Sequence, residues 1–437
     1  MEERHRLLLI KQNPWWKNEK IILPEFEREL LEEVLNHVKY KQIIAIIGLR
    51  RVGKTILLKQ LINSLDAPQN NLCYIAFDDI DFQKYQIAEE LINYFFEFSD
   101  KNNTRYLFLD EVQKLPNWTD LIKTIYDTEE NLKIFISGSA SLELNNYKET
   151  LAGRILTFRM PVLTFNEFVR YFGWEHSLDT ENMFREYDLK FADKKEQYHE
   201  LFADYLIKGA FPELLDVDIS ESEFINKYIN ESVIEKAIAD VAKLTGEDEK
   251  IIYELFRLLA NSNAQLFEIV NLSGILKVNR NLVSRYISLL EKSFLIKVSY
   301  NSTASVAKQV RSSKKQYFAH SSMVIALLGY PFEVIQTEIA GHLVEGIIAN
   351  HIEKSAFWRS PQKDEVDIVT AEKLPIEVKY QSSITKNDVR PLLKYCRKFN
   401  IEKGIIVTKD LFEIRCIDNK EFTFIPAWFF LLLRRGW

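Results

Sequence analysis

The sequence has few of the features that mark secreted, membrane-spanning or disordered proteins. Its 437 residues include three cysteines, and none of them forms a C-x-x-C pair, which argues against a disulfide framework and a cysteine zinc site. Glycine and proline number 13 and 11, too few for a collagenous or low-complexity chain. No apolar run approaches the roughly 18 residues of a membrane-spanning helix, and no basic lead precedes an apolar segment. We therefore expect a cytoplasmic protein without a membrane partner.

What the sequence does contain is enough apolar surface for several cores. Apolar residues make up 47% of the chain and charged residues 27%, and a chain of this length is about right for two to four domains. The formal net charge is −6. Any nucleic-acid site must therefore be a local basic patch on an acidic molecule.

The hydrophobic pattern changes along the chain and predicts a multidomain α/β protein. Short β-rich runs alternate with helical stretches from residue 43 onward, which indicates a parallel sheet covered by helices. Later segments are helical and rich in aromatic residues, then basic, then mixed α/β. The expected parts are an N-terminal arm over 1–40, an α/β core over 41–165, a helical lid over 166–246, a winged helix-turn-helix over 247–330 and an α/β domain over 331–437.

A phosphate-binding motif lies at the start of the α/β core. Gly48–Thr55 fits G-x-x-x-x-G-K-[ST], between the expected strand Ile43–Ile47 and the expected helix Lys54–Ile62, as a P-loop requires. In such a loop backbone N–H groups surround phosphate oxygens, Lys54 reaches the β- and γ-phosphates, and the Thr55 hydroxyl ligates Mg²⁺. We expect ATP and Mg²⁺ as ligands. The residues expected to surround the phosphates are Gly48, Arg51, Val52, Gly53, Lys54, Thr55 and Ile56.

An acidic pair follows a later strand of the same core. Tyr106–Leu109 is apolar and is followed by Asp110 and Glu111, as in a Walker B element. Asp110 is expected to hold the magnesium through water and Glu111 to polarise the attacking water. The second acid favours an ATPase over a protein that only binds nucleotide.

Two further residues are candidates for sensing the γ-phosphate. Ser137 ends the expected strand Leu132–Ile136, and Arg154 precedes the last strand of the core. Ser137 is either a contact of the γ-phosphate or attacking water, or a strand-end cap. Arg154 is either a γ-phosphate sensor, acting in cis or from a neighbouring subunit of a homo-oligomer, or a salt-bridge partner.

The expected winged helix carries the basic patch. Residues 277–315 contain nine basic residues and one acid, a local charge of +8. On the expected third helix, Asn279–Glu291, polar and basic side chains share an outward stripe, which suits contact with double-stranded or branched DNA. A protein-binding or interdomain module is the alternative. The candidate DNA contacts are Arg280, Arg285, Lys292, Arg311, Lys314 and Lys315.

The C-terminal α/β domain contains acids in the order of a nuclease-type metal site. Glu345 lies on an expected helix, Asp367 ends a strand, and Glu377 and Lys379 share a face of the next strand. Three acids can hold Mg²⁺, and a lysine can help to orient a hydroxide for phosphodiester cleavage. An acid-x-Lys pair is also common on protein surfaces, so loss of cleavage stays open.

With these motifs together, the chain resembles a widespread archaeal and bacterial family of AAA-type ATPases. Its members join a P-loop domain to a winged helix and to a C-terminal domain of unknown function that is similar to PD-(D/E)XK nucleases. The resemblance implies an ATPase sheet of strand order 5-1-4-3-2 and a restriction-endonuclease-like last domain, which is often degenerate in the family. Besides Gly48–Thr55, the segments that carry it are Leu109–Gln113, Ser137–Ser139, Leu151–Arg154, Pro161–Phe168, Gly209–Glu213, Glu365–Asp367 and Ile376–Lys379.

The sequence thus predicts a Mg²⁺-dependent ATPase that couples its nucleotide state to a DNA-binding winged helix and a nuclease-like module. The alternative is a slow nucleotide-dependent signalling or scaffolding switch, with a protein-binding winged helix and an inactive nuclease-like domain.

Overall fold

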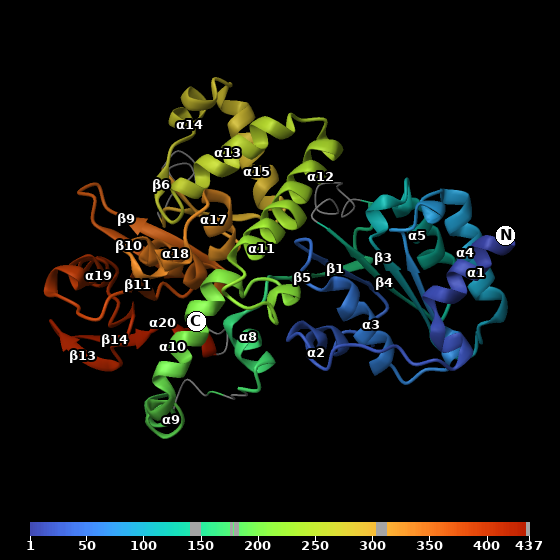
Figure 1. Ribbon diagram of the computed structural model, residues 1–437, viewed down its shortest axis with the longest axis horizontal. Coiled ribbons are helices and arrows are strands. Elements are labelled where there is room, and N and C mark those ends of the chain that lie inside the picture. Colours follow the sequence, from blue (N-terminus) through green and yellow to red (C-terminus); the bar gives the residue numbers. More distant parts are fainter. Residues whose placement is uncertain (140–149, 175–177, 179–182, 303–312, 434–437) are drawn as a thin grey trace. The chain divides into compact units, whose positions relative to one another are not determined.

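The computed structural model describes residues 1–139, 150–174, 178, 183–302 and 313–433. The chain divides into two compact units, Met1–Pro161 and Val162–Trp437 (Figure 1). Each unit contains its own sheet and is described by itself. Of the predicted DNA contacts, Arg311 lies outside the described residues.

The first unit is built on a five-stranded, all-parallel sheet in the order β2-β3-β4-β1-β5. Read from the β5 edge, this is the predicted order 5-1-4-3-2, which is confirmed. The strands are β1 (Ile43–Gly48), β2 (Leu72–Ala76), β3 (Arg105–Asp110), β4 (Leu132–Gly138) and β5 (Ile155–Met160). The central strands are buried on both faces, as their continuous apolar runs require.

Helices connect these strands and cover the sheet. The helices are α1 (Glu3–Gln12), α2 (Leu30–Leu35), α3 (Lys54–Ser64), α4 (Tyr85–Phe98) and α5 (Trp118–Thr128). The α3 crossover runs from β1 to the β2 edge, whereas α4 and α5 lead back across the sheet. Because such crossovers are right-handed, α3 lies on one face and α4 and α5 on the other. The carboxyl ends of β1, β3 and β4 therefore meet at one edge, where the predicted motifs lie.

The N-terminal arm covers the open edge of the sheet at β2. The Asn13 side chain accepts a hydrogen bond from Tyr74 N (2.6 Å) and donates one to Tyr74 O (2.8 Å). The indole N–H groups of Trp15 and Trp16 both donate to Leu72 O, at 3.0 and 2.8 Å. These contacts occupy backbone groups that an edge strand otherwise offers to another chain.

The second unit begins with helices. They are α8 (Phe165–Tyr171), α9 (Met183–Lys190), α10 (Lys195–Lys208), α11 (Ser222–Lys227), the π-helical η8 (Tyr228–Glu235) and α12 (Lys236–Thr245). The described residues between 166 and 245 contain no strand, in agreement with the helical pattern of the sequence.

The described residues between 249 and 318, which include most of the basic segment, form three helices and a three-stranded antiparallel sheet in the order β6-β8-β7. The elements are α13 (Glu249–Asn261), β6 (Leu266–Phe267), α14 (Ile269–Leu276), α15 (Arg280–Lys292), β7 (Ile296–Tyr300) and β8 (Lys314–Phe318), followed by α17 (Ser321–Leu328). Residues 266–267 pair with β8 as a short strand, and the second helix begins at Ile269.

A six-stranded mixed sheet forms the last part of the chain, in the order β13-β14-β12-β11-β10-β9. Its strands are β9 (Ser355–Arg359), β10 (Glu365–Thr370), β11 (Pro375–Lys379), β12 (Lys403–Thr408), β13 (Glu413–Ile417) and β14 (Lys420–Pro426), and its helices are α18 (Ile339–His351), α19 (Lys386–Phe399) and α20 (Ala427–Leu432). Asp367 lies on β10, Glu377 and Lys379 on β11, and Glu345 on α18.

Candidate functional site

The loop after β1 has the backbone that a phosphate-binding loop needs. Gly48 ends β1, and a Cβ there would lie 2.3 Å from the carbonyl oxygen of Met160, so only glycine fits beside β5. Gly53 has a φ of 97° immediately before α3, a conformation that favours glycine. The two glycines of the motif are thus required by close approach and by backbone angle, respectively.

The motif lysine is buried against the loop. Lys54 is 5% exposed, and its Nζ donates to Gly48 O (3.2 Å) and Leu49 O (2.9 Å). Its ammonium therefore lies where β1 passes into the loop. Of the other predicted phosphate-surrounding residues, Arg51 is exposed with a φ of 66°, Val52 is buried, and Ile56 is half-buried.

Asp110 is the centre of a hydroxyl network at the same edge of the sheet. Thr55 Oγ1 donates to its Oδ2 at 2.7 Å, and so does the Tyr74 hydroxyl, also at 2.7 Å. Ser137 donates to its Oδ1. Asp110 is 1% exposed, and burial together with this carboxylate raises the pKa of Tyr74 well above its ordinary value. The structure therefore brings Thr55, Asp110 and Ser137 together.

Glu111 lies next to this network in a strained backbone conformation. Its φ is 54°, unusual for a residue with a side chain. Its backbone N–H donates to Ser137 Oγ at 3.2 Å, and its Oε2 accepts from Gln113 Nε2 at 2.5 Å. The Gln113 amide also donates to Ser139 Oγ at 3.3 Å. The carboxylate is thus held by Gln113, which belongs to the quoted segment Leu109–Gln113 but was given no role from the sequence.

Arg154 is not brought to the phosphate-binding loop of its own chain. In the parallel pair of β1 and β5, Ile43 lies beside Ile155 and Gly48 beside Met160, so Arg154 precedes the opposite end of the strand, roughly 16 Å away at 3.3 Å per residue. Its guanidinium forms two bonds with Asp127 of α5, at 2.9 and 3.1 Å. The hypothesis that Arg154 senses the γ-phosphate of its own chain is therefore wrong. The alternative, that Arg154 is a salt-bridge partner, describes its contact with Asp127.

Two residues near the loop were missed from the sequence. Tyr74 is a tyrosine on an apolar strand, and this pattern is too common in sequences to mark a functional residue. Arg28, in the arm, is 6% exposed, and it donates to Val52 O at 2.6 Å and to Pro161 O at 2.9 Å. Arg28 therefore ties the phosphate-binding loop to the end of the sheet, and no local motif surrounds it.

The outward face of α15 agrees with the predicted stripe. Asn279 caps the helix by accepting from Leu282 N at 2.8 Å, and Arg280, Arg285 and Lys292 are exposed. Arg285 also pairs with Glu247 at 2.9 Å. Arg285 and Lys292, at i and i+7, therefore share one solvent-facing side of the helix, whereas Arg280 is exposed in its first turn.

The two lysines at the start of β8 have opposite environments. Lys314 is half-buried, its Nζ lies 5.8 Å from the centre of the Tyr300 ring, and burial lowers its pKa. Lys315 is 2% exposed and cannot contact DNA from this position. The prediction of a DNA contact at Lys315 is corrected, because successive side chains of a strand point to opposite faces.

Lys315 lies instead inside the predicted nuclease-type cluster. Its Nζ is 2.9 Å from Glu345 Oε1, 2.7 Å from Glu365 Oε1 and 3.2 Å from Asp367 Oδ1. Tyr317, two residues further along β8, donates to Glu345 Oε1 at 3.0 Å. We refer to Lys315, Glu345, Glu365, Asp367, Glu377 and Lys379 as the carboxylate cluster.

The remaining members of the cluster lie on β10 and β11. Asp367 Oδ2 accepts from Val378 N at 3.0 Å, and Lys379 Nζ donates to Glu377 Oε1 at 2.7 Å. The predicted set of Glu345, Asp367 and Glu377 is not arranged as a metal site. Within the described ranges, no group of three or more His, Cys, Asp or Glu residues is placed to hold a metal ion.

The charges in the cluster shift one another's pKa values. Burial and Asp367 raise the pKa of Glu345 to about 7 and that of Glu377 to about 8. Burial alone would raise the pKa of Asp367, but Lys315 and Lys379 outweigh it and hold that pKa below its usual value. Burial likewise opposes the charge of Lys315, but the carboxylates around it keep its pKa raised. Lys315 is therefore a charged ammonium.

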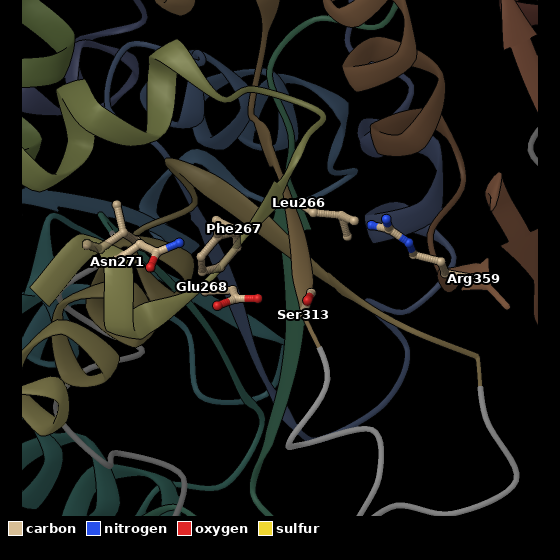
Figure 2. A pocket seen from close by; sticks show the side chains of 7 residues that line it. Leu266, Phe267, Glu268, Asn271, Ser313 and Arg359 are labelled. Carbon is tan, nitrogen blue, oxygen red and sulfur yellow. The ribbon is translucent and has the colours of Figure 1, made fainter. Parts of the chain in front are cut away.

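Two cavities adjoin β6 in the second unit. One, of about 400 Å³, is lined by Lys315, Glu345, Asp367 and Lys379 among others, so the carboxylate cluster faces open space. The other, of about 410 Å³, is shown in Figure 2, where Arg359 points toward Leu266 across from Glu268. Arg359 is its one cationic side chain among the described lining residues, and it is paired with Glu365 at 3.6 Å. The second cavity therefore offers little to a polyphosphate.

Among the described residues, no helix has the length and apolar character needed to cross a membrane.

The fold and the loop define a P-loop domain, and sequence families agree. Residues 40–169 match a family described as an AAA domain. Residues 199–333 and 333–430 match two domains of unknown function, DUF8612 and DUF4143. The first unit therefore has the strand order of a P-loop fold, and most of it is similar to an AAA domain.

The whole chain has relatives of similar length. It is 27% identical over 417 residues to the uncharacterised protein MJ1637 of Methanocaldococcus jannaschii, covering 88% of this chain and 85% of that protein. A second uncharacterised protein of that organism, MJ1544, is 24% identical and covers 94% of each chain.

Two solved structures are similar to this chain at a low level. The Aeropyrum pernix ORC1 protein in complex with DNA aligns with 72% of this chain and 95% of its own, at 15% identity and a TM-score of 0.31. AMPPCP-bound DnaA from Aquifex aeolicus covers 64% of this chain and 92% of its own, at 18% identity and a TM-score of 0.24.

Proposed function

We propose that this protein is a Mg²⁺-dependent ATPase. The observation that carries the proposal is the contact between Thr55 of the phosphate-binding loop and Asp110 at the end of β3, 2.7 Å apart. A hydroxyl and a carboxylate oxygen at this separation can both ligate one Mg²⁺, which prefers oxygen ligands and substrate phosphates. The residues present therefore fit the metal that the motif implies.

Each residue at this edge has a distinct task in the proposed reaction. Lys54 and the backbone N–H groups from Gly48 to Ile56 bind and orient the phosphates of ATP. Thr55 and Asp110 would hold Mg²⁺, which neutralises charge on the transferring phosphoryl group when bound. Glu111 accepts a hydrogen bond from the attacking water and orients it. Ser137 and Gln113 keep the two carboxylates in place.

The exposed face of α15 supports a second part of the proposal, contact with duplex DNA. Arg285 and Lys292 are seven residues apart and lie on one solvent-facing side of a helix in the winged-helix segment 247–330, and Arg280 is exposed at the start of that helix. Such side chains bind phosphates without reading bases, so binding is salt-dependent and weakly sequence-specific. The lid over 166–246 is proposed to pass the loss of the γ-phosphate to this module.

The environment of Lys315 favours one part of the alternative function, namely that the nuclease-like domain is inactive. A lysine inside the carboxylate cluster argues against metal-dependent cleavage, so the proposed function does not include a nuclease reaction. The last domain, 331–437, is then a nuclease-like module without cleavage. The rival to DNA contact is a winged helix that binds protein.

The proposal is tested by measuring ATP binding and hydrolysis by the purified chain with and without duplex DNA. The parent is expected to bind Mg-ATP and to hydrolyse it, and Lys54→Ala to lose at least about 10-fold in affinity because the phosphates lose their cation. A parent without Mg-ATP binding would refute the ATPase.

The DNA part has its own readout and control. The double variant Arg285→Ala/Lys292→Ala should lower the slope of log affinity against log salt by about 2, since each phosphate contact contributes about 0.9. Lys403→Ala, which removes an exposed lysine on β12, is the matched control. Equal DNA affinity and equal salt dependence in all three proteins would favour the protein-binding rival.

A further inference from the structure

We propose that the ammonium of Lys315 occupies the place of a divalent metal in the carboxylate cluster, so that strand β8 of the winged-helix segment keeps this site closed to metal. The inference does not rest on ATP hydrolysis, because all residues involved belong to the second unit. It concerns a nuclease-like domain whose predicted metal ligands do not fit a metal while Lys315 is present.

The ammonium of Lys315 donates hydrogen bonds to Glu345 and Asp367 and forms an ion pair with Glu365. An ammonium has three N–H donors, and Lys315 Nζ has three carboxylate partners, Glu345, Glu365 and Asp367, at 2.7 to 3.2 Å. These partners come from α18 and β10, the elements that were predicted to supply metal ligands. A cation of the chain thus lies between the oxygens that a metal would require.

The charge balance of the cluster explains why a cation is needed there. The cluster contains four carboxylates and two lysines, with Lys379 paired to Glu377 at 2.7 Å. Removing Lys315 leaves Glu345, Glu365 and Asp367 close together without their shared cation. Buried charges without a partner are costly, so the vacated position should accept another cation.

Strand β8 supplies hydrogen-bond donors to the carboxylate cluster from one of its two faces. Lys315 and Tyr317 are two residues apart and share a face, and both donate to Glu345 Oε1, at 2.9 and 3.0 Å. Lys315 also lies in the middle strand of its sheet, beside Leu266 of β6 and Ser299 of β7. Both neighbouring strands therefore fix the lysine, which makes a chance surface contact a poor explanation.

Access to the cluster does not require unfolding. The cavity of about 400 Å³ is lined by Lys315 together with Glu345, Glu365 and Asp367. A hydrated ion entering it would meet the oxygens directly if the ammonium were absent. The obstacle to metal binding is therefore the lysine and not burial of the site.

The test is Mn²⁺ binding by the nucleotide-free full chain, measured by electron paramagnetic resonance. All proteins carry Asp110→Asn, which removes the proposed metal ligand of the first unit. We expect the Asp110→Asn parent to lack any Mn²⁺ site that is lost when Asp367 is also replaced by asparagine. Adding Lys315→Ala should create one Mn²⁺ site per chain, and adding Asp367→Asn to that variant should abolish it. Lys314→Ala, on the opposite face of β8, is the control and should create none.

Thermal unfolding gives a second readout. Lys315→Ala should lower the melting temperature, and Mn²⁺ should raise that of Lys315→Ala but not that of Lys314→Ala. Asp367-dependent Mn²⁺ binding by the parent would overturn the proposal, as would a folded Lys315→Ala protein that binds none. If Lys315→Ala does not fold, Mn²⁺ binding by Lys315→Gln is measured in its place. Whether the parent shows Asp367-dependent Mn²⁺ binding still tests the proposal.

Discussion

Thr55 and Asp110 are 55 positions apart in sequence, yet Thr55 Oγ1 donates to Asp110 Oδ2 at 2.7 Å. The contact exists because β1 and β3 are parallel strands of one sheet, and their carboxyl ends open at the same edge. A residue that begins the helix after one strand therefore meets a residue that ends another. The proposed metal site follows from the topology as much as from the two motifs.

Asp110→Asn should remove Mg²⁺-dependent hydrolysis. Asparagine has the shape of aspartate, but it lacks the charge for Mg²⁺, and its amide would face hydroxyls that now donate to Asp110. We expect kcat to fall by on the order of 100-fold or more, since the metal stabilises transition-state charge. The measurement is the ATPase rate as a function of magnesium concentration.

Glu111→Gln is the informative comparison for Asp110→Asn. It should retain Mg-ATP binding while losing hydrolysis, because Glu111 is proposed to act on the water and not on the metal. Unchanged kcat in Asp110→Asn, or equal loss of nucleotide affinity in both variants, would contradict the assigned roles.

Tyr74→Phe should reduce the rate without removing nucleotide binding. The substitution deletes one hydroxyl that donates to Asp110 at 2.7 Å and leaves the ring in place. Partners that orient a metal ligand typically contribute 10- to 100-fold, so we expect kcat to fall by about 10-fold. Steady-state kinetics at saturating ATP give the comparison. Tyr106→Phe, on the neighbouring strand β3, should leave kcat unchanged, and a similar fall in both would point to a general packing effect.

Arg154→Ala should leave the ATPase rate of an isolated chain within about twofold of the parent. Arg154 precedes the opposite end of the sheet from the phosphate-binding loop and pairs with Asp127, so it cannot reach its own γ-phosphate across a strand length. The rate is measured over a range of protein concentrations. A loss that grows as concentration rises would show that Arg154 acts in a neighbouring subunit.

The contact of Thr55 and Ser137 with Asp110 at the proposed nucleotide site follows from signals that are mostly local. A glycine-rich segment between a strand and a helix carries its chemistry within eight residues, and an acidic pair at a strand end is also contiguous. Tyr74 and Arg28 escaped prediction because they reach the site from another strand and from the arm. Their contacts depend on register and crossing geometry, which no local pattern contains.

Lys314 and Lys315 show that a count of basic residues does not predict which side chains face solvent. Both contribute to the basic segment, and both were expected to face DNA. A strand places neighbouring side chains on opposite faces, so only one of the two could do so, and the sequence does not say which face meets α18 and β10. The local excess of basic residues identified the segment, but it could not show that Lys315 pairs with the carboxylates of α18 and β10.

His320 caps α17 and is fully buried. Its Nδ1 accepts from Ser322 N at 3.1 Å, and burial lowers its pKa to about 3. The unfolded chain has a histidine pKa near 6.5. Because the folded-state pKa is the lower one, the stabilisation is complete above pH 6.5 and is lost as the pH falls toward 3. At pH 5 the loss should be on the order of 2 kcal/mol.

His320→Asn separates this titration from the other acid-sensitive groups. Asparagine keeps a side-chain acceptor for the helix cap, does not titrate, and loses the ring that packs edge-on against Tyr205 at 4.7 Å. The variant should be less stable at pH 7.5 by about 1–3 kcal/mol from lost packing, yet lose less stability than the parent between pH 7.5 and 5. Urea unfolding at the two pH values measures both. Parallel losses in parent and variant would mean that the pKa of His320 is the same in the folded protein as in the unfolded chain.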